Sequence, residues 1–226
     1  MFDLPFAQCA PGEAIPGGLG AAAAADFGLP PKTPLAVGMI DAHAGGLGCL
    51  GADLPGVADA TNQPPLTARM ALIAGTSTCH MASSRAPTFV DGVWGPYYSA
   101  MMPDLYLNEG GQSAAGALID FHLDNHAAAE ELNAAAEAAG VATTVILNTR
   151  LEAMAADKGG SVASLASDLH VTPDFVGNRS PLADPTMRGG LVGLGMSATL
   201  DDLAILYLAI VQVGDLAALG RYHDLC

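Results

Sequence analysis

The sequence predicts an α/β fold, and two features of it carry that prediction. An apolar run over residues 36–40 has the length of a buried strand and stops at Asp41, after which small residues and glycines follow at once. Two further short apolar runs flank a turn at residues 75–78, and alanine-rich stretches of helical character follow residue 112. A buried strand that ends on a carboxylate is typical of open α/β sheets, in which ligands bind at the carboxyl ends of strands.

The N-terminal half alternates short regular elements with turns rich in proline and glycine. A helix over residues 21–27 is expected to end at Gly28, because a glycine after a helix readily adopts the left-handed conformation and two prolines follow it. The other expected elements are a strand (35–40), a turn or helix start (42–51), a linker (52–66), two strands (70–74 and 79–83) and an irregular stretch (84–107).

The C-terminal half is predicted to be mainly helical, since alanine favours helices without any special function. Its last helix has a clear start, with Thr199 as N-cap and acidic residues in the first turn. In chain order we expect helices (112–126, 127–139 and 141–156), a strand (165–171), a polar loop (176–190) and that last helix (197–212).

Composition limits the possible partners. The chain has 226 residues, of which 51% are hydrophobic and only 5% aromatic, so its core must be built mainly from aliphatic side chains. Eight basic and 23 acidic residues give a net charge of -15. Such a surface repels nucleic acids and anionic membranes, so we expect neither as a partner. Any bound phosphate must be held by backbone amides and a metal ion.

The four cysteines, Cys9, Cys49, Cys79 and Cys226, form no CxxC pair and have no zinc-ligand spacing. Reduced thiols in a cytoplasmic protein are therefore expected. No apolar run reaches the length needed to span a membrane, and the N-terminus lacks the basic region of a signal peptide.

Asp41 and His43 form the first candidate site. A carboxylate held at the end of a strand can act as a general base toward a hydroxyl group, with the histidine beside it. The structural alternative is an aspartate that caps the following helix and a solvated histidine. Spacing alone leaves both interpretations open.

The turn at Gly75, Thr76, Ser77 and Thr78 is the second candidate. Glycine lets the backbone approach an anion closely and hydroxyl groups add donors, so this turn could hold phosphate oxygens. Hairpins also use Gly, Ser and Thr simply to turn. A P-loop is excluded, because no GxxxxGK[ST] pattern occurs and neither of the two lysines follows a glycine.

A third candidate is the polar glycine loop that begins at Asn108 and Glu109. Glu109 could bind a sugar hydroxyl, or the loop could simply cap the next helix. His122 and His126 have i, i+4 spacing, but no third ligand lies nearby, so no metal site is expected. An acid, a phosphate-binding turn and a polar glycine loop together indicate phosphate transfer to a polar small molecule.

Five short motifs occur in one order and resemble the FGGY family of carbohydrate kinases, within it the D-ribulokinase and ribitol-kinase-like pentulose kinases. The similarity extends from about residue 10 to Gln212. The motifs are Asp41-Ala42-His43-Ala44-Gly45-Gly46, Gly75-Thr76-Ser77, Gly92-Val93-Trp94-Gly95-Pro96-Tyr97, Asn108-Glu109-Gly110-Gly111-Gln112-Ser113-Ala114 and Gly177-Asn178-Arg179-Ser180-Pro181-Leu182-Ala183-Asp184.

This resemblance implies a fragment of an actin-like, ribonuclease H-like two-domain ATPase fold that transfers the ATP γ-phosphate to a sugar or polyol with magnesium. It implies that residues 1–60 end the N-terminal domain, that 61–212 begin the C-terminal domain and that 213–226 are a tail outside the family. The implied catalytic base is Asp41, with His43 and Glu109 also binding the sugar. The implied nucleotide-binding residues are Gly75, Thr76, Ser77, Gly116 and Asp120.

Members of this family are roughly twice as long as this chain. Their first phosphate loop, with a magnesium-linked aspartate, and their adenosine-binding Gly-Gly loop are not found in the sequence. We therefore expect a truncated or frameshifted piece of a kinase gene that is inactive by itself. The alternatives are a non-catalytic remnant with weak ligand binding and, less favoured, an Asp/His hydrolase, which lacks a nucleophile motif.

Overall fold

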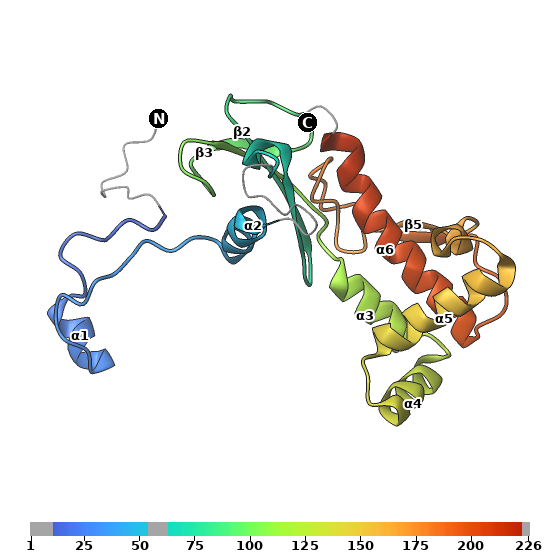
Figure 1. Cartoon of the computed structure of the whole chain (residues 1–226). Coiled ribbons are helices and arrows are strands. Elements are labelled where there is room, and N and C mark those ends of the chain that lie inside the picture. Colours follow the sequence, from blue (N-terminus) through green and yellow to red (C-terminus); the bar gives the residue numbers. More distant parts are fainter. Residues whose placement is uncertain (1–10, 54–62, 223–226) are drawn as a thin grey trace. The chain divides into compact units, whose positions relative to one another are not determined.

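The computed structural model describes residues 11–53 and 63–222, with side chains as far as Val213, and forms two compact units (Figure 1). Unit 1 comprises the chain up to Ala71 together with Met81–Phe89 and Gly95–Asn108. Unit 2 comprises Leu72–His80, Val90–Trp94 and the chain from Glu109 onward. The chain has one four-stranded sheet, whose strand order is β1-β2-β4-β3 among the described residues. The strands are β1 (Met70–Ala74), β2 (Thr78–Ser84), β3 (Trp94–Tyr98) and β4 (Tyr106–Gly110).

Unit 1 begins with α1 (Ala21–Phe27), which ends as predicted at Gly28. Gly28 has a φ of 64° and donates its N–H to the carbonyls of the last helical turn, which is the usual left-handed C-terminal cap.

The prediction of a strand over residues 35–40 is wrong, because the structure has no strand there. Leu35 and Val37 exchange backbone hydrogen bonds with residues 12–15, but only Ala36 forms a bridge, with Ala14. No second strand covers the run within the described residues, and Ile40 is 61% exposed. The length of the apolar run suggested a buried strand. Because no strand of a sheet pairs with it among the described residues, the segment remains an extended connection.

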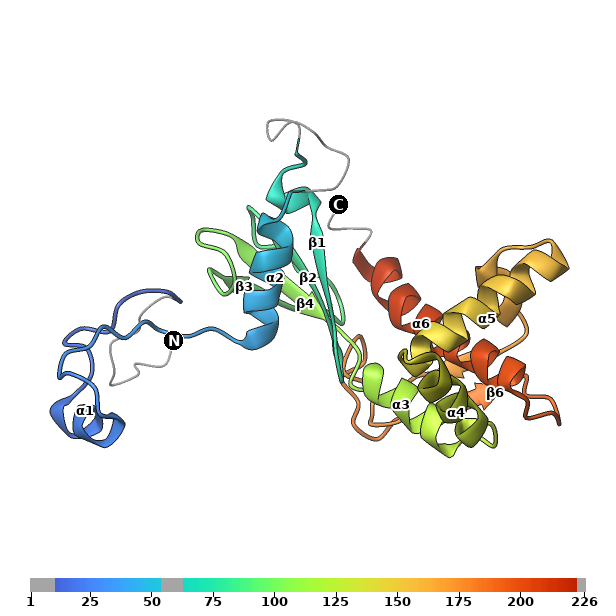
Figure 2. The ribbon, with the colours of Figure 1, turned by 60° about the horizontal axis from the view of Figure 1, so that its bottom comes forward.

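Helix α2 (Asp41–Gly51) follows directly, and it places His43, Gly46 and Leu50 on one buried face. A Cβ on Gly46 would lie 2.8 Å from the Met101 sulfur and 3.0 Å from the Met81 terminal methyl. The missing side chain therefore lets two flexible methionines fill the space beside the helix. Figure 2 shows α2 alongside the strands, of which β1, β2 and β4 are neighbours in the sheet.

Arg69 closes the C-terminal end of α2. Its guanidinium group donates to the carbonyls of Leu50 at 2.9 Å and Ala52 at 3.0 Å, and also to the Pro64 carbonyl at 2.9 Å. The carbonyls of Leu50 and Ala52 lie at the end of the helix, where they have no partner inside it. The Arg69 cation therefore satisfies these two carbonyls and complements the helix dipole. The short 3-10 helix η2 (Leu66–Ala68) leads from this point to β1.

Unit 2 is mostly helical and also contains the small antiparallel ribbon β5–β6, in which Val171 is opposite Leu191. Its remaining elements are α3 (Gly116–Asn125), α4 (Ala129–Ala139), α5 (Thr143–Lys158), η3 (Val162–Ala166), β5 (His170–Thr172), β6 (Gly190–Val192) and α6 (Leu200–Tyr222).

The core of unit 2 is aliphatic, as composition predicted. Leu118, Leu132, Leu147, Leu151 and Leu203 are each no more than 2% exposed and belong to one cluster. Helix α6 contacts α3, α5, η3 and β5, and it is buried along more than one face (Figure 2). A helix that is apolar on several sides needs such neighbours around it.

Local end signals in unit 2 agree with the sequence. Gly140 and Gly159 end α4 and α5 in the left-handed conformation. At the start of α6 the Asp202 amide donates to the Thr199 hydroxyl, and the Thr199 amide donates to the Asp202 carboxylate at 2.8 Å. This reciprocal pair is a capping box. The helix runs on to Tyr222, so the expectation that the helical pattern stops near residue 212 is wrong.

Residues 84–107 are not irregular throughout, as the sequence had predicted, because β3 and the start of β4 lie within them. Strand β3 contains Pro96, which argues against a central strand, and it lies at the edge of the sheet. Strand β4 is polar yet buried, since Asn108 is fully buried and its amide donates to the Thr88 carbonyl at 3.0 Å. That partner lies 20 residues away, so local sequence alone did not reveal the strand.

Candidate functional site

The turn that joins β1 to β2 is docked onto the first turn of α3. The amide of Gly116 donates to the Gly75 carbonyl at 2.9 Å, and the amides of Ala115 and Ala117 both donate to the Thr76 carbonyl, at 2.9 and 3.3 Å. Gly75 and Thr76 remain exposed on the outer side of the turn, and Ser77 is half-buried. The structure therefore brings together three of the predicted nucleotide-binding residues, Gly75, Thr76 and Gly116.

Two glycines make this close approach possible. A Cβ on Gly116 would lie 2.6 Å from the Gly75 carbonyl oxygen, and one on Gly111 would lie 2.0 Å from the Thr78 carbonyl oxygen. Next to Gly111, the Thr78 amide donates to the Gln112 carbonyl at 3.0 Å, and the Gln112 amide donates to the Thr78 hydroxyl at 3.1 Å. The hydroxyl-bearing turn is thus held by backbone bonds on both sides.

Asp120 lies one turn after Gly116 in α3 and is exposed. Residues four apart in a helix share a face, so Asp120 and Gly116 lie on the same side of α3. The position of Asp120 on the helix is therefore compatible with the predicted nucleotide site, which stays a prediction for this residue.

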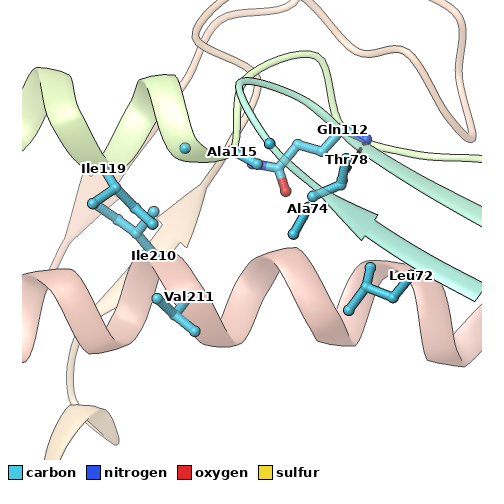
Figure 3. Close-up of a pocket in the computed structure, with 10 residues that line it drawn as sticks. Leu72, Ala74, Thr78, Gln112, Ala115, Ile119, Ile210 and Val211 are labelled. Atoms are coloured by element: carbon cyan, nitrogen blue, oxygen red, sulfur yellow. Dashed lines mark hydrogen bonds between the residues drawn. The ribbon is translucent and has the colours of Figure 1, made fainter. Parts of the chain in front are cut away.

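A pocket of about 240 Å³ opens between β1, α3 and α6, beside this turn (Figure 3). Its walls are mainly apolar, with Leu72, Ile119 and Ile210 among them. Gln112 also lines it and is 9% exposed, and its amide nitrogen donates to the Ala114 carbonyl at 2.6 Å. The amide oxygen of Gln112 is buried and has no partner among the described residues, so it can accept a hydrogen bond from a group that enters the pocket.

Glu109, the sugar-binding candidate, is 8% exposed near the end of β4. Its carboxylate accepts a hydrogen bond from the Arg179 guanidinium at 2.9 Å, and the Arg179 Cζ atom lies 4.8 Å from the centroid of the Trp94 ring. Burial first, and then the neighbouring Glu109 carboxylate, raise the pKa of the Cys79 thiol. Cys79 is therefore a neutral thiol beside this charged pair.

The loop that carries Arg179 is ordered by its own polar contacts. The Asn178 side chain donates to the Asp174 carboxylate and accepts from the Leu182 amide, both at 2.8 Å, and the Ser180 hydroxyl donates to the Gly92 carbonyl at 2.7 Å. Sequence reasoning identified this segment as a polar loop and a family-like motif, but it did not assign Arg179 to the site. The signals available were the place of Arg179 within this motif and its positive charge in a strongly acidic chain.

In unit 1, Asp41 and His43 are two residues apart at the start of α2. Asp41 is exposed, is the first residue of the helix and accepts a hydrogen bond from the Ala42 amide at 2.7 Å. It therefore stands at a helix start and not at a strand end as predicted. The N-cap position belongs to Ile40, so the alternative interpretation of Asp41 as the cap is also wrong. His43 is 7% exposed and lines a hollow with Met39, so it is not solvated.

The described residues contain no group of three His, Cys, Asp or Glu side chains arranged to hold a metal ion. No helix in the same part of the chain is long and apolar enough to cross a membrane.

Comparisons with known proteins give a consistent result. The model of the FGGY family of carbohydrate kinases, C-terminal domain, matches residues 70–213. An FGGY carbohydrate kinase domain-containing protein of Danio rerio is 55% identical over 215 residues, which cover 95% of this chain and 39% of the relative. A D-ribulokinase of Saccharomyces cerevisiae is 40% identical over 199 residues, covering 84% of this chain and 28% of the relative. The chain thus spans about two fifths or less of these relatives.

Solved structures agree on the fold. A xylulose kinase from Rhodospirillum rubrum matches with a TM-score of 0.60 at 23% identity, covering 95% of this chain and 37% of that one. A gluconate kinase from Lactobacillus acidophilus matches with a TM-score of 0.65 at 16% identity, covering 96% and 37%. These likenesses confirm the predicted fold class, which is α/β and part of an actin-like ATPase fold.

Proposed function

Because this chain belongs to the FGGY family of carbohydrate kinases, we propose that it carries part of the catalytic machinery of a kinase that phosphorylates a pentulose or pentitol with ATP. The observation that carries the proposal is the turn from Gly75 to Ser77, which is docked by three backbone hydrogen bonds onto the first turn of α3. Phosphoryl transfer requires mainly fixed positions and compensated charge, and this turn is a rigid, exposed backbone segment with two hydroxyl groups.

The pentulose class is supported by the names of relatives. The 40% identical yeast protein is a D-ribulokinase, and a 30% identical protein of Staphylococcus saprophyticus is a ribulokinase. We therefore place D-ribulose first among the substrates to be tested, before ribitol.

In the proposed reaction Asp41 is the general base. Its carboxylate takes the proton of the attacking sugar hydroxyl, the hydroxyl oxygen bonds to the γ-phosphorus, and the bond between this phosphorus and the β,γ-bridging oxygen breaks to release ADP. The exposed position of Asp41 at a helix start supports this role, because its carboxylate remains accessible to a sugar hydroxyl. His43 and Glu109 are the further proposed contacts of the sugar.

The nucleotide side is proposed to consist of Gly75, Thr76, Ser77, Gly116 and Asp120. Magnesium enters as part of the Mg-ATP substrate, since Mg²⁺ is bound largely by the phosphates and water. No cluster for a metal occurs among the described residues, so no residue of this chain is assigned to the ion.

For domain organisation, we keep residues 1–60 as the end of the N-terminal domain, 61–212 as the start of the C-terminal domain and 213–226 as a tail. The family match over residues 70–213 supports the second range. The use of ATP and the free thiols of Cys49 and Cys79 support a cytoplasmic enzyme.

The second candidate is a non-catalytic piece with weak ligand binding, and the coverage of only 39% of the Danio rerio relative favours it for the isolated chain. Base, phosphate-binding turn and sugar carboxylate must act together with the rest of the cleft, so we expect the 226 residues alone to release no ADP.

Two forms of the protein test both candidates. One is the chain alone, and the other is a chimera in which this chain replaces the matched 215-residue segment of the Danio rerio relative. ADP release is measured with D-ribulose, D-xylulose, ribitol and glycerol. We expect activity in the chimera only, with a loss of about 10²- to 10⁴-fold in kcat for Asp41→Asn, because the amide keeps the shape but cannot accept the proton.

A chimera in which Asp41→Asn leaves kcat nearly normal would refute Asp41 as the base. Sugar-dependent ADP release by the chain alone, abolished by the same substitution, would show that the isolated chain is a working enzyme and would refute the second candidate.

A further inference from the structure

Three side chains from distant parts of unit 2 meet at the sugar-binding candidate. Glu109 comes from β4, Trp94 is the first residue of β3, and Arg179 lies in the loop between β5 and β6, 70 residues after Glu109. The side chains of Arg179 and Glu109 are only 24% and 11% exposed. An ion pair with so little exposure is weakly screened, so its geometry matters more than that of a surface pair.

The Arg179 guanidinium group has two kinds of partner. It donates to a Glu109 carboxylate oxygen at 2.9 Å, and its central carbon lies 4.8 Å from the centroid of the Trp94 ring. A planar guanidinium suits both contacts, because it can present N–H groups in its plane while its face lies over an aromatic ring. A lysine ammonium has the charge but lacks the flat face.

The loop that carries Arg179 has further contacts besides this ion pair. Asn178 is bound to Asp174, its amide donates to the Asp184 carbonyl at 2.8 Å, and Ser180 is bound to Gly92. The loop is therefore anchored on both sides of Arg179. We therefore relate the Arg179 charge to its other partner, the Glu109 carboxylate.

The neutral Cys79 thiol adds to this interpretation. Because burial raises its pKa, Cys79 contributes no second anion that would compete with Glu109 for the guanidinium group. The Arg179 guanidinium therefore acts on the Glu109 carboxylate without competition from a Cys79 thiolate.

We propose that Arg179, supported by the Trp94 ring, is a positioning residue that holds the Glu109 carboxylate in one orientation for the hydroxyl groups of the sugar. This inference rests on the proposed function, because it takes Glu109 as a sugar ligand. A carboxylate fixed in advance loses less side-chain entropy when the sugar binds, so the effect of Arg179 falls on sugar affinity.

The protein contains a probe for this cluster, because Trp94 is its sole tryptophan. Its fluorescence reports on the guanidinium group beside the ring without any label. D-Ribulose is titrated into the full 226-residue chain and into the variants Arg179→Met, Arg179→Lys and Glu109→Gln, with Trp94 emission and calorimetry as readouts.

Arg150→Met is the matched control. Arg150 is also an arginine paired with a carboxylate, that of Asp201, but it joins α5 to α6 away from the Glu109 cluster, and its side chain is 41% exposed. The control removes an ion pair of the same chemical type from the same unit.

We expect Arg179→Met to weaken D-ribulose binding by about 10- to 100-fold, the range for a lost hydrogen bond to a charged group. Arg179→Lys should restore part of the affinity because it keeps the charge, and Arg150→Met should bind like the unmodified chain. Without sugar, Glu109→Gln and Arg179→Met should each change Trp94 emission, and the double variant should show less than the sum because the groups act as one unit.

The outcomes separate this inference from the proposed function. Unchanged sugar affinity in Arg179→Met, or additive changes of Trp94 emission, would overturn the positioning role and leave Glu109 as a sugar ligand. Coupled emission changes in the chain, together with a chimera in which Glu109→Gln leaves the KM for D-ribulose unchanged, would overturn the sugar site itself, and with it the purpose assigned to Arg179.

Discussion

Replacing Gly116 by alanine tests the docking of the turn at Gly75–Ser77, the proposed phosphate site, onto α3. The new Cβ would lie 2.6 Å from the carbonyl oxygen of Gly75 and 3.2 Å from its carbonyl carbon. Both atoms belong to the backbone, so no side chain can rotate away to relieve the overlap. The turn must move, and its hydrogen bonds to the amides of Ala115, Gly116 and Ala117 must lengthen or break.

The size of the effect follows from these contacts. Overpacking of this kind costs about 1–3 kcal/mol. We take one of the three backbone hydrogen bonds as lost and the other two as lengthened, which adds about 1 kcal/mol. Alanine in a helix returns about 1 kcal/mol relative to glycine. The net loss in the free energy of unfolding is therefore about 2 kcal/mol, which shifts a urea midpoint by roughly 1 M for a slope of about 2 kcal/mol per M.

Urea unfolding followed by far-UV circular dichroism measures the midpoint, and amide hydrogen exchange at residues 115–117 shows where protection is lost. The control is Gly190→Ala in β6 of the same unit, since no atom lies within 4 Å of the Cβ that it would add. We expect the control to stay within about 0.5 kcal/mol of the unmodified protein. A midpoint and an exchange pattern for Gly116→Ala that match those of the control would refute the reasoning.

Two further predictions concern carboxylates. Glu109→Gln should raise the KM for the sugar more than the KM for ATP in the chimera, because it leaves a mismatched polar group at the sugar; equal effects on both substrates would identify a structural residue. Hydrogen bonds from Thr199 and Ser197 lower the pKa of Asp202 below its ordinary value of 3.8. Asp202→Asn should therefore destabilise unit 2 by about 1 kcal/mol at pH 7. The deficit should shrink as the pH falls from 3.8, where the unfolded carboxylate takes up its proton, through the lower pKa of the folded state. Thermal unfolding against pH checks this, with exposed Asp124→Asn as control, and a deficit that does not change with pH would contradict it.

The elements that sequence predicted well are those whose ends depend on local chemistry. Gly28, Gly140 and Gly159 each end a helix in the left-handed conformation, where an L side chain would be strained. The hairpin around Gly75 and the start of α6 at Thr199 were likewise predicted from residue types that lie within a few positions of each other. Such signals need no knowledge of the tertiary partner.

The elements that sequence missed depend on partners far along the chain. The run over residues 35–40 is apolar enough for a strand, but among the described residues its only strand-like pairing is the bridge from Ala36 to Ala14. Strand β4 is buried despite its polar residues, because Asn108 and Glu109 find partners in Thr88 and Arg179. Hydrophobic periodicity does not reveal a buried polar strand, since its stability comes from hydrogen bonds that only the folded chain provides.

The same distinction applies to the candidate site. Gly75, Thr76 and Gly116 were predicted as neighbours of the nucleotide, and the hydrogen bonds of the turn do join them. Arg179 was not predicted, because Glu109, to which it donates a hydrogen bond, lies 70 residues earlier in the chain. Asp41 was predicted as a carboxylate at the end of a strand, but it lies exposed at the start of a helix.

One close backbone contact relates the two halves of the candidate site in unit 2. Thr78 directly follows the phosphate-binding turn, and Gly111 comes two residues after Glu109. The space where a Gly111 side chain would stand is occupied by the Thr78 carbonyl, 2.0 Å from the Cβ position, and the Thr78 amide is bonded to the Gln112 carbonyl. The distance from the turn to the backbone of β4 that carries Glu109 is therefore set by backbone atoms, which cannot adjust by changing rotamer, while the Glu109 carboxylate itself is held by Arg179. Phosphoryl transfer depends on the separation of phosphate and hydroxyl, so the proposed roles of the turn and of Glu109 fit two elements that meet at one fixed backbone crossing.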